Sequence, residues 1–528
     1  MDRPRSSAVH ELTVQEIDAA ITTFGSINKA ADALAVPRTS LKRRIRELHA
    51  GTYREMPARK TVPMKRPRSG VKRWIFSSAQ CNTAIDEAFM DSLETYAKEM
   101  DATIHISGFT YNVNPYGGQN KKEPLEYHPR VRPYLTNAPF EIAGKLMFCG
   151  EMDTLPTATN PLSGFATYTR GMWGILPHPK FVLESVPVRM SDDPKIIMTT
   201  GAVTKPNYIQ KKAGIKAQFH HIIGAVVVEL DTKGDFFVRQ LVADDDGSFQ
   251  DLDKIFSGSE VLSGQKARTI TWGDIHAEYL DPAVEDGCWG RDDSMVDSLA
   301  PDYQFFHDVL DFRRRNHHSI KDPHHWYKMH VTGRESVADE ISDAARFLER
   351  TARPGCLSVV VDSNHDRALE KWLKGADPRF DPANADFYFR AQAAYYSALR
   401  NREDDKFLLL EWAMISEGKI DLIEKDIMFS RDSDSIMLDG IEYGMHGHKG
   451  ANGARGHIKS YARMGPKANV AHTHHAAVYE GIYQAGHSCT RDVEYNRGGL
   501  TSWNQSHIVA YPNGKRTIVT MRGNKWRA

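Results

Sequence analysis

The sequence lacks the marks of a membrane or secreted protein. Its longest apolar stretch, residues 222–230, is far shorter than the roughly 20 residues of a membrane-spanning helix. The first twelve residues carry charges but no apolar core of the kind found in secretory signals. We therefore expect a cytoplasmic protein with no membrane partner.

Cysteine is scarce and scattered. The five cysteines form no CxxC pair; they are Cys81, Cys149, Cys288, Cys356 and Cys489. This spacing excludes a disulfide framework and a zinc ribbon, and it fits a reducing compartment. The sequence also lacks internal repeats and long low-complexity segments.

A net charge of zero hides an uneven distribution along the 528 residues. Residues 37–73 contain thirteen Lys or Arg but only two acidic residues, Glu47 and Glu55. Of the 23 histidines, 16 lie after residue 270. A chain of this length predicts two to four domains. We expect a basic segment near the N-terminus and metal ligands in the C-terminal half.

Residues 1–50 show the punctuation of a helix-turn-helix. The apolar spacing between residues 12 and 48 is helical, with breaks at Gly25-Ser26 and at Val36-Pro37. The pattern GSINKAADALAVPRTSLKRRI resembles the helix-turn-helix of bacterial and phage DNA-binding proteins. The resemblance implies that the third helix enters the major groove of DNA and presents basic residues to it. These residues are Arg38, Lys42, Arg43, Arg44 and Arg46.

Two further segments separate this module from the C-terminal half. Residues 51–72 are rich in Pro, Arg and Lys and predict a basic linker that follows phosphates without reading sequence. Residues 73–266 alternate strand and helix signals, which predicts an α/β domain whose role the sequence does not reveal. The alternative for residues 1–50 is a three-helix module that docks a protein and exposes its basic face to solvent.

Metal-ligating residue types recur at fixed spacings in residues 267–528. The stretch TITWGDIH delivers Asp274 and His276 after an apolar strand, and a second apolar run ends at Asp308. A third, LSVVVDSNHD, ends in a polar loop with Asn364 at its tip. A glycine-rich stretch contains His446 and His448, and the strand KANVAHTHH ends with a histidine pair two residues apart, His472 and His474. Carboxylates and imidazoles gathered in this way predict a site for divalent metal ions.

The order of these motifs resembles the calcineurin-like metallophosphoesterase superfamily. That superfamily carries DxH, GDxxD, GNHD or GNHE, a lone His and GHxH, and the same order runs through about 200 residues of this chain. The resemblance implies a β-sandwich flanked by helices over residues 267–528. It also implies two divalent metal ions. Mn²⁺ is the favoured metal, and Fe²⁺, Zn²⁺ or Mg²⁺ are the alternatives.

The resemblance also assigns ligands to each metal. One ion would be held by Asp274, His276, Asp308 and His474. The second would be held by Asp308, Asn364, His446 and His472, so that Asp308 bridges the two. Two such cations bind phosphate oxygens and activate a water molecule for attack on phosphorus.

Catalysis and substrate binding are expected from residues beside the ligands. His365 would protonate the leaving oxygen or stabilise the charge of the pentavalent phosphorus, and Asp366 would orient His365. Four arginines would bind substrate phosphates: Arg313, Arg314, Arg315 and Arg367. The alternative is a solvated face, which a run of arginines forms more often. For the histidines without a place in the pattern we expect surface or capping roles; these are His317, His318, His324, His325, His475 and His487.

The chain departs from the superfamily pattern at three positions. His307 stands where the second motif has Gly, Ser363 precedes Asn364, and Ala471 precedes His472. The small-for-small changes are tolerable, whereas His307 puts the local turn at the second motif in doubt.

The whole layout resembles the early metallophosphoesterases of tailed phages that degrade host DNA. We therefore expect a metal-dependent DNA nuclease that acts by a two-metal mechanism, with DNA as its partner. If the chain is phage-encoded, it acts in the cytoplasm of the host bacterium. A homo-oligomer is a further expectation. Two alternatives stay open: a nucleotide or protein phosphoesterase, and a non-catalytic DNA-binding regulator on the same fold.

Overall fold

The computed structural model describes most of the chain after residue 69. The described residues are 16, 17, 19, 20, 23, 30, 31, 33 and 34, and then 70–111, 125–316, 318–403, 407–432, 434–493 and 496–528. The chain divides into two compact units, Met1–Lys60 and Thr61–Ala528.

In the first unit, the described residues agree with the first two predicted helices. Ile17 and Ala20 are helical and buried, and so are Ala30 and Ala31. The predicted third helix and the basic linker lie outside the described residues, together with Arg38, Lys42, Arg43, Arg44 and Arg46. Their DNA contacts therefore stay predictions.

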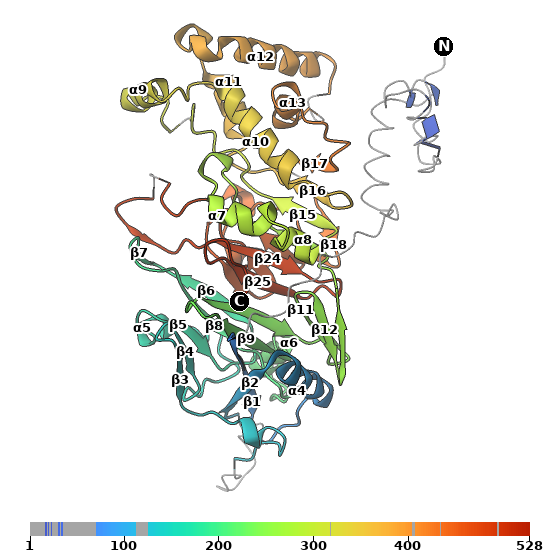
Figure 1. Ribbon diagram of the computed structural model, residues 1–528, viewed down its shortest axis with the longest axis vertical. Helices are drawn as coiled ribbons and strands as arrows, with labels where there is room; N and C mark the ends of the chain where they lie inside the picture. The colour runs from blue at the N-terminus through green and yellow to red at the C-terminus, as the bar shows by residue number, and fades with distance from the viewer. Residues whose placement is uncertain are drawn as a thin grey trace. The chain divides into compact units, whose positions relative to one another are not determined.

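The second unit has a mixed α/β fold with several sheets (Figure 1). A four-stranded sheet has the order β10 (Phe236–Val242), β9 (Gly224–Leu230), β1 (Lys72–Gln80) and β2 (Ala102–Phe109). The parallel strands β1 and β2 are joined by α4 (Glu87–Met100), whose cap Asp86 accepts a hydrogen bond from the N–H of Phe89. This agrees with the alternation of strand and helix signals that predicted an α/β fold for residues 73–266.

A six-stranded sheet forms the centre of the C-terminal half. Its order is β17 (Ile427–Phe429), β16 (Leu357–Val360), β15 (Tyr303–Phe306), β14 (Thr269–Thr271), β24 (Ser506–Ala510) and β25 (Arg516–Thr520). Strands β14 to β17 are parallel, whereas β24 pairs antiparallel with β14 and β25. The four parallel strands therefore end at the same edge.

Successive side chains of β15 point to opposite faces of this sheet. Phe306 packs into an apolar core with Trp289 and Phe347, on the face covered by helices. Phe305 stacks on Tyr443 at 4.5 Å, on the face covered by a second sheet. The helices contributing to the first core include α7 (Pro282–Glu285), α8 (Met295–Leu299), α10 (Val337–Thr351), α11 (Ala368–Gly375), α12 (Ala385–Arg400) and α13 (Leu409–Ser416). The six-stranded sheet is thus a middle layer between helices and another sheet.

The second sheet has ten strands and joins distant parts of the chain. Five come from the C-terminal half: β18 (Met437–Leu438), β19 (Ile441–Glu442), β20 (Lys467–Val470), β22 (Ile482–Gln484) and β21 (Ala477–Tyr479). The other five come from the middle segment: β6 (Val182–Val186), β8 (Lys195–Thr199), β5 (Trp173–Leu176), β4 (Leu146–Cys149) and β3 (Pro139–Ile142).

The antiparallel pairing of β21 with β6 corrects the predicted domain organisation. The boundary predicted at residue 266 does not separate two cores, because one apolar cluster contains Phe76, Ile175, Val478 and Ile518. Backbone hydrogen bonds and buried apolar surface both cross that boundary.

Shorter elements complete the unit. The helices are α5 (Phe165–Tyr168), α6 (Lys212–Phe219), α7 (Pro282–Glu285), α9 (Pro323–Val331) and α14 (Ile458–Tyr461). The strands are β7 (Val188–Arg189), β11 (Phe249–Asp251), β12 (Lys254–Ser257), β13 (Glu260–Ser263) and β23 (Leu500–Thr501). Among the residues that the structure describes, no helix has both the length and the apolar character that a membrane span requires.

Candidate metal centre

The predicted ligands come together at one edge of the two stacked sheets. Asp274 and His276 follow β14, Asp308 follows β15, and Asn364 follows β16. The histidines come from the other sheet: His446 follows β19, and His472 and His474 follow β20. Because parallel strands end at a common edge, residues up to 200 positions apart in the sequence become neighbours.

The first group of ligands surrounds Asp274 and Asp308. The Nε2 atoms of His276 and His474 lie 3.1 Å apart. His474 Nε2 lies 3.3 Å from Asp274 Oδ2, and His276 Nε2 lies 3.8 Å from Asp308 Oδ2. These are the four residues that the sequence assigns to the first metal ion.

The second group shares Asp308 with the first. His446 Nε2 lies 3.3 Å from Asp308 Oδ2 and 3.1 Å from Asn364 Oδ1. Ligand atoms of Asp308, His446 and His472 lie within 4.8 Å of one another. The same oxygen of Asp308 thus faces both groups, which is the arrangement of a bridging ligand.

The spacing and burial of these groups fit two divalent cations. Ligand atoms about 2.1 Å from one cation lie about 3.0 to 3.4 Å apart in octahedral or tetrahedral geometry. Most of the distances above fall in that range. The side chains of Asp274 and Asp308 are fully buried, and the Oδ2 atom of each makes no hydrogen bond with a described residue. Buried carboxylate oxygens without partners are costly unless a cation compensates them.

The electrostatics of the protein point the same way. Burial and the adjacent Asp308 carboxylate raise the pKa of Asp274 to about 7. Burial favours a low pKa for His446, but the carboxylates of Asp308 and Asp274 outweigh it and raise that pKa to about 9. Burial favours a low pKa for His276 as well, but the carboxylates of Asp311 and Asp308 outweigh it and raise that pKa to about 9. The two buried carboxylates thus favour positive charge in their surroundings, which divalent cations can supply.

Several ligands have left-handed backbone conformations, which are unfavourable for residues other than glycine. The φ angles are 44° at His276, 46° at Asp308, 76° at His472 and 60° at His474. The doubt about the turn at the second motif is resolved here, because the positive φ falls on Asp308 and not on His307. Asp tolerates this conformation better than most residues. The surrounding sheets hold these strained loops in place, so that the ligand side chains converge.

His307 is a contact that the sequence did not anticipate. Its side chain is buried, and its Nδ1 lies 3.4 Å from Nδ1 of His446. Burial and then His446 lower the pKa of His307 to about 3, so its ring is neutral. A neutral ring beside the second nitrogen of His446 orients that ligand with its Nε2 toward Asp308.

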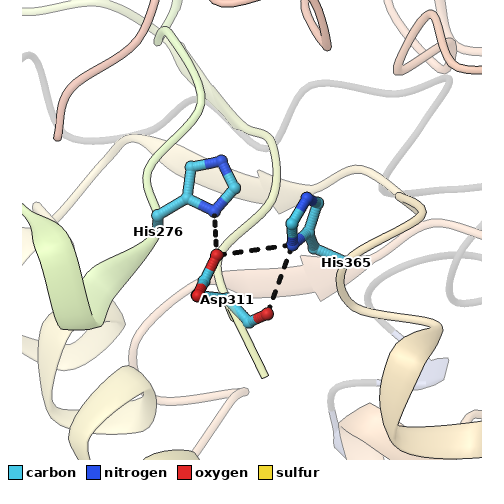
Figure 2. Close-up of side chains that lie close together, drawn as sticks. All are labelled: His276, Asp311 and His365. Carbon is cyan, nitrogen blue, oxygen red and sulfur yellow. Dashed lines mark hydrogen bonds and ion pairs between the residues drawn. The ribbon is translucent and has the colours of Figure 1, made fainter. Parts of the chain in front are cut away.

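Asp311 is the second residue whose role the sequence missed. Its Oδ1 lies 3.0 Å from Nδ1 of His276 and 3.5 Å from Nδ1 of His365 (Figure 2). His365 Nδ1 also lies 3.2 Å from the backbone oxygen of Asp311, to which it can donate a hydrogen bond. The carboxylate fixes Nδ1 of His276 as the protonated nitrogen, which leaves Nε2 with a lone pair for a metal. The signal was present in the sequence, since Asp311 follows Asp308 by three residues as in GDxxD.

The structure corrects the role expected for Asp366. Its Oδ1 accepts a hydrogen bond from the N–H of Leu310, and its Oδ2 accepts one from the hydroxyl of Ser363. Asp366 therefore ties the loop after β16 to the loop after β15. The carboxylate beside His365 belongs to Asp311 instead.

Comparison with known proteins identifies one clear relative. The chain is 38% identical over 468 residues to Protein A1 of Escherichia phage T5, an alignment that covers 87% of this chain and 83% of that protein. The chain belongs to the Protein A1 family. This phage relative supports the expected bacteriophage origin. No family model and no solved structure matches the chain.

In this member of the Protein A1 family, two of the arginines expected to grip phosphate serve the fold. Arg314 contacts Glu278 and Asp343, and Arg315 contacts both oxygens of Asp381 at 2.7 and 2.8 Å. Their side chains are only 7% and 1% exposed. The prediction is wrong for these two, because buried carboxylates already occupy their guanidinium groups.

The other two arginines also have protein partners. Arg313 lies over the ring of Tyr279, 4.8 Å from its centroid. Arg367 pairs with Asp362 and Asp432, while 29% of its side chain is exposed. For Arg313 and Arg367, phosphate binding stays a prediction.

Replacing Arg315 with methionine is expected to destabilise the protein. Removing one partner of a buried ion pair leaves the other charge uncompensated, which costs about 3 to 5 kcal/mol. Urea unfolding measures this loss, and the exposed pair of Arg379 with Asp377 provides a control in Arg379→Met, for which little change is expected. Unchanged stability in Arg315→Met, combined with weaker substrate binding, would restore the phosphate-binding role.

Proposed function

We propose that this chain is a two-metal deoxyribonuclease of the calcineurin-like metallophosphoesterase type, which degrades host DNA during phage infection. The observation that carries the proposal is that the seven predicted ligands lie together, with the other six gathered around Asp308. Each comes from the motif position that the superfamily pattern assigns; the seven are Asp274, His276, Asp308, Asn364, His446, His472 and His474.

The layering of the second unit is compatible with this superfamily. A six-stranded sheet packs on a second sheet through Phe305 and Tyr443, and helices cover its other face. This arrangement supports a β-sandwich flanked by helices. The motif loops all emerge at one edge of that sandwich.

The donor set suits divalent cations, with Mn²⁺ as the first candidate among Mn²⁺, Fe²⁺, Zn²⁺ and Mg²⁺. Such cations would neutralise charge on the phosphate oxygens and lower the pKa of the attacking water. The buried residues around the site keep Asp274 and Asp308 away from bulk solvent. His307 and Asp311 hold His446 and His276 with their Nε2 atoms facing the carboxylates.

His365 is placed to handle the leaving group. Its Nδ1 contacts the backbone oxygen and the carboxylate of Asp311, so its Nε2 is the nitrogen left for the substrate (Figure 2). The attacking water would first lose a proton to bulk solvent. As the resulting hydroxide oxygen bonds to phosphorus and the P–O bond to the sugar breaks, a proton from His365 Nε2 would pass to the departing oxygen. Asp311 acts as a positioning residue in this scheme.

The case for DNA as the substrate comes from the N-terminal sequence. The helix-turn-helix pattern and the thirteen basic residues between positions 37 and 73 favour a polyanionic partner. A nucleotide or protein phosphoesterase would use the same metal centre without needing this segment. A non-catalytic regulator would have no reason to keep the ligand set complete and buried.

A cleavage assay separates these alternatives. The full chain is incubated with plasmid DNA in Mn²⁺ or in EDTA, and with cyclic nucleotides and a phosphopeptide in parallel. We expect DNA cleavage in Mn²⁺ and none in EDTA. Hydrolysis of only the small substrates would replace the nuclease with a phosphoesterase, and inertness toward every substrate would favour the regulator.

A further inference from the structure

A cavity of about 350 Å³ is lined by residues that have no part in the chemistry above. It opens between the middle segment and the C-terminal strands. The residues that matter for its chemistry are Lys145, Phe236, His487, Arg491, Trp503 and Arg522. A volume of this order is at the small end of the range for ligand pockets.

The cavity and the metal centre share a wall. The ring of Trp503 lies 4.1 Å from that of His474, measured between centroids, and 5.5 Å from that of His487. His487 lies 6.0 Å from His474 and is fully buried, and its Nε2 makes no hydrogen bond with a described residue. A group in the cavity would therefore contact residues that touch a metal ligand.

Arg491 carries hydrogen-bonding capacity that the described residues do not use. Its Nη1 donates to the backbone oxygens of Met190 and Asp192. Its Nε and Nη2 are buried and make no hydrogen bond with a described residue. Buried guanidinium groups normally have all such donors satisfied, so this side chain is suited to an additional acceptor.

The charge of the lining favours an anion. Arg522 lies over the rings of Trp173 and Phe236, at 5.3 and 4.7 Å, and a lysine is the third cation of the lining. Two carboxylates also line the cavity, those of Asp193 and Asp235. Asp235 is neutralised by Lys525 at 2.7 Å, which leaves Asp193 against the three cations. Positive charge therefore exceeds negative charge around the space.

We propose that this cavity is a second nucleotide-binding site, next to the metal centre. Arg491 and Arg522 would bind the phosphate, since guanidinium groups donate paired hydrogen bonds to phosphate oxygens. Trp503 offers an aromatic surface for a base. The choice of a nucleoside monophosphate as the ligand rests on the proposed nuclease function. This group could come from a free product nucleotide or from the end of a DNA strand.

Isothermal titration calorimetry tests the site without depending on catalysis. The full chain is titrated in EDTA, which keeps cations out of the metal centre, with deoxyadenosine monophosphate and with deoxyadenosine. We expect the monophosphate to bind and the nucleoside to bind at least about tenfold more weakly, because charged hydrogen bonds to the phosphate are lost. Absence of monophosphate binding by the wild-type chain overturns the proposal.

Three variants locate the binding. Arg491→Gln and Arg522→Gln should each weaken monophosphate binding by about tenfold or more. Arg497→Gln serves as the matched control, since Arg497 pairs with Asp492 and is 61% exposed. Thermal unfolding shows whether each variant is folded. If one cavity variant does not fold, the other decides. Arg491→Lys is a further variant, which keeps the positive charge in place. Wild-type affinity in every folded cavity variant overturns the proposal.

A competing trinucleotide identifies the source of the ligand. Displacement of the monophosphate by a 5′-phosphorylated trinucleotide, but not by its unphosphorylated form, assigns the site to a strand end. Failure of both to compete assigns it to the free nucleotide. A chain that binds nucleotide in EDTA but never cleaves DNA would refute the proposed function alone, and a nuclease without this binding would refute the cavity alone.

Discussion

Replacing Asp308 with alanine is expected to remove both metal ions and to abolish DNA cleavage. Oδ2 of Asp308 lies 3.3 Å from Nε2 of His446 and 3.8 Å from Nε2 of His276, so one oxygen serves both groups of ligands. Burial favours a raised pKa for Asp308, but the neighbouring histidines outweigh it and hold the pKa well below its usual range. The carboxylate is therefore charged and available to cations at neutral pH.

Metal analysis and plasmid cleavage measure the effect. We expect the metal content to fall from two ions per chain to less than one, and cleavage to fall to the level seen in EDTA. Asp302→Ala is the matched control, because Asp302 lies just before β15 and pairs with Arg268. Wild-type turnover in Asp308→Ala would exclude Asp308 from the site.

Replacing His365 with asparagine is expected to slow DNA cleavage by roughly 10² to 10⁴-fold, the usual contribution of proton transfer to a poor leaving group. The sugar oxygen of DNA leaves as a high-energy alkoxide unless it is protonated. Nitrophenolate is already a stable anion, so hydrolysis of bis(nitrophenyl) phosphate should change much less. The ring of His365 makes its polar contacts with Asp311 and packs edge-on against His276 at 4.6 Å. The hydrogen bond from His365 to Oδ1 of Asp308 comes from the backbone N–H, which the substitution keeps. The metal content should therefore stay close to that of the wild type.

The two substrates and the metal content are compared in the same preparations. His324→Asn is a suitable control because His324 is an exposed residue of α9. Equal losses on both substrates would show that His365 binds phosphate or stabilises charge instead of donating a proton. Loss of metal in His365→Asn would make the residue structural.

The sequence by itself determined the local features of the candidate metal centre. Apolar runs predicted the strands before Asp274, Asp308 and Asn364, because an apolar segment followed by a polar loop is a pattern of neighbouring residues. The order of the motifs carried the resemblance that assigns seven candidate ligands to two groups. The strand–helix–strand unit at the start of the middle segment was also predictable, from alternation and helical spacing.

The tertiary structure decided everything that depends on distant partners. Arg315 and Asp381 are 66 positions apart, so no local pattern distinguishes this buried ion pair from a solvated run of arginines. The choice between Asp311 and Asp366 beside His365 depends on how the loops after β15 and β16 meet. The sheet shared across residue 266 and the cavity beside Trp503 likewise join segments hundreds of residues apart. Sequence spacing fixes direction along one strand or helix, whereas long-range contacts depend on the packing of the whole core.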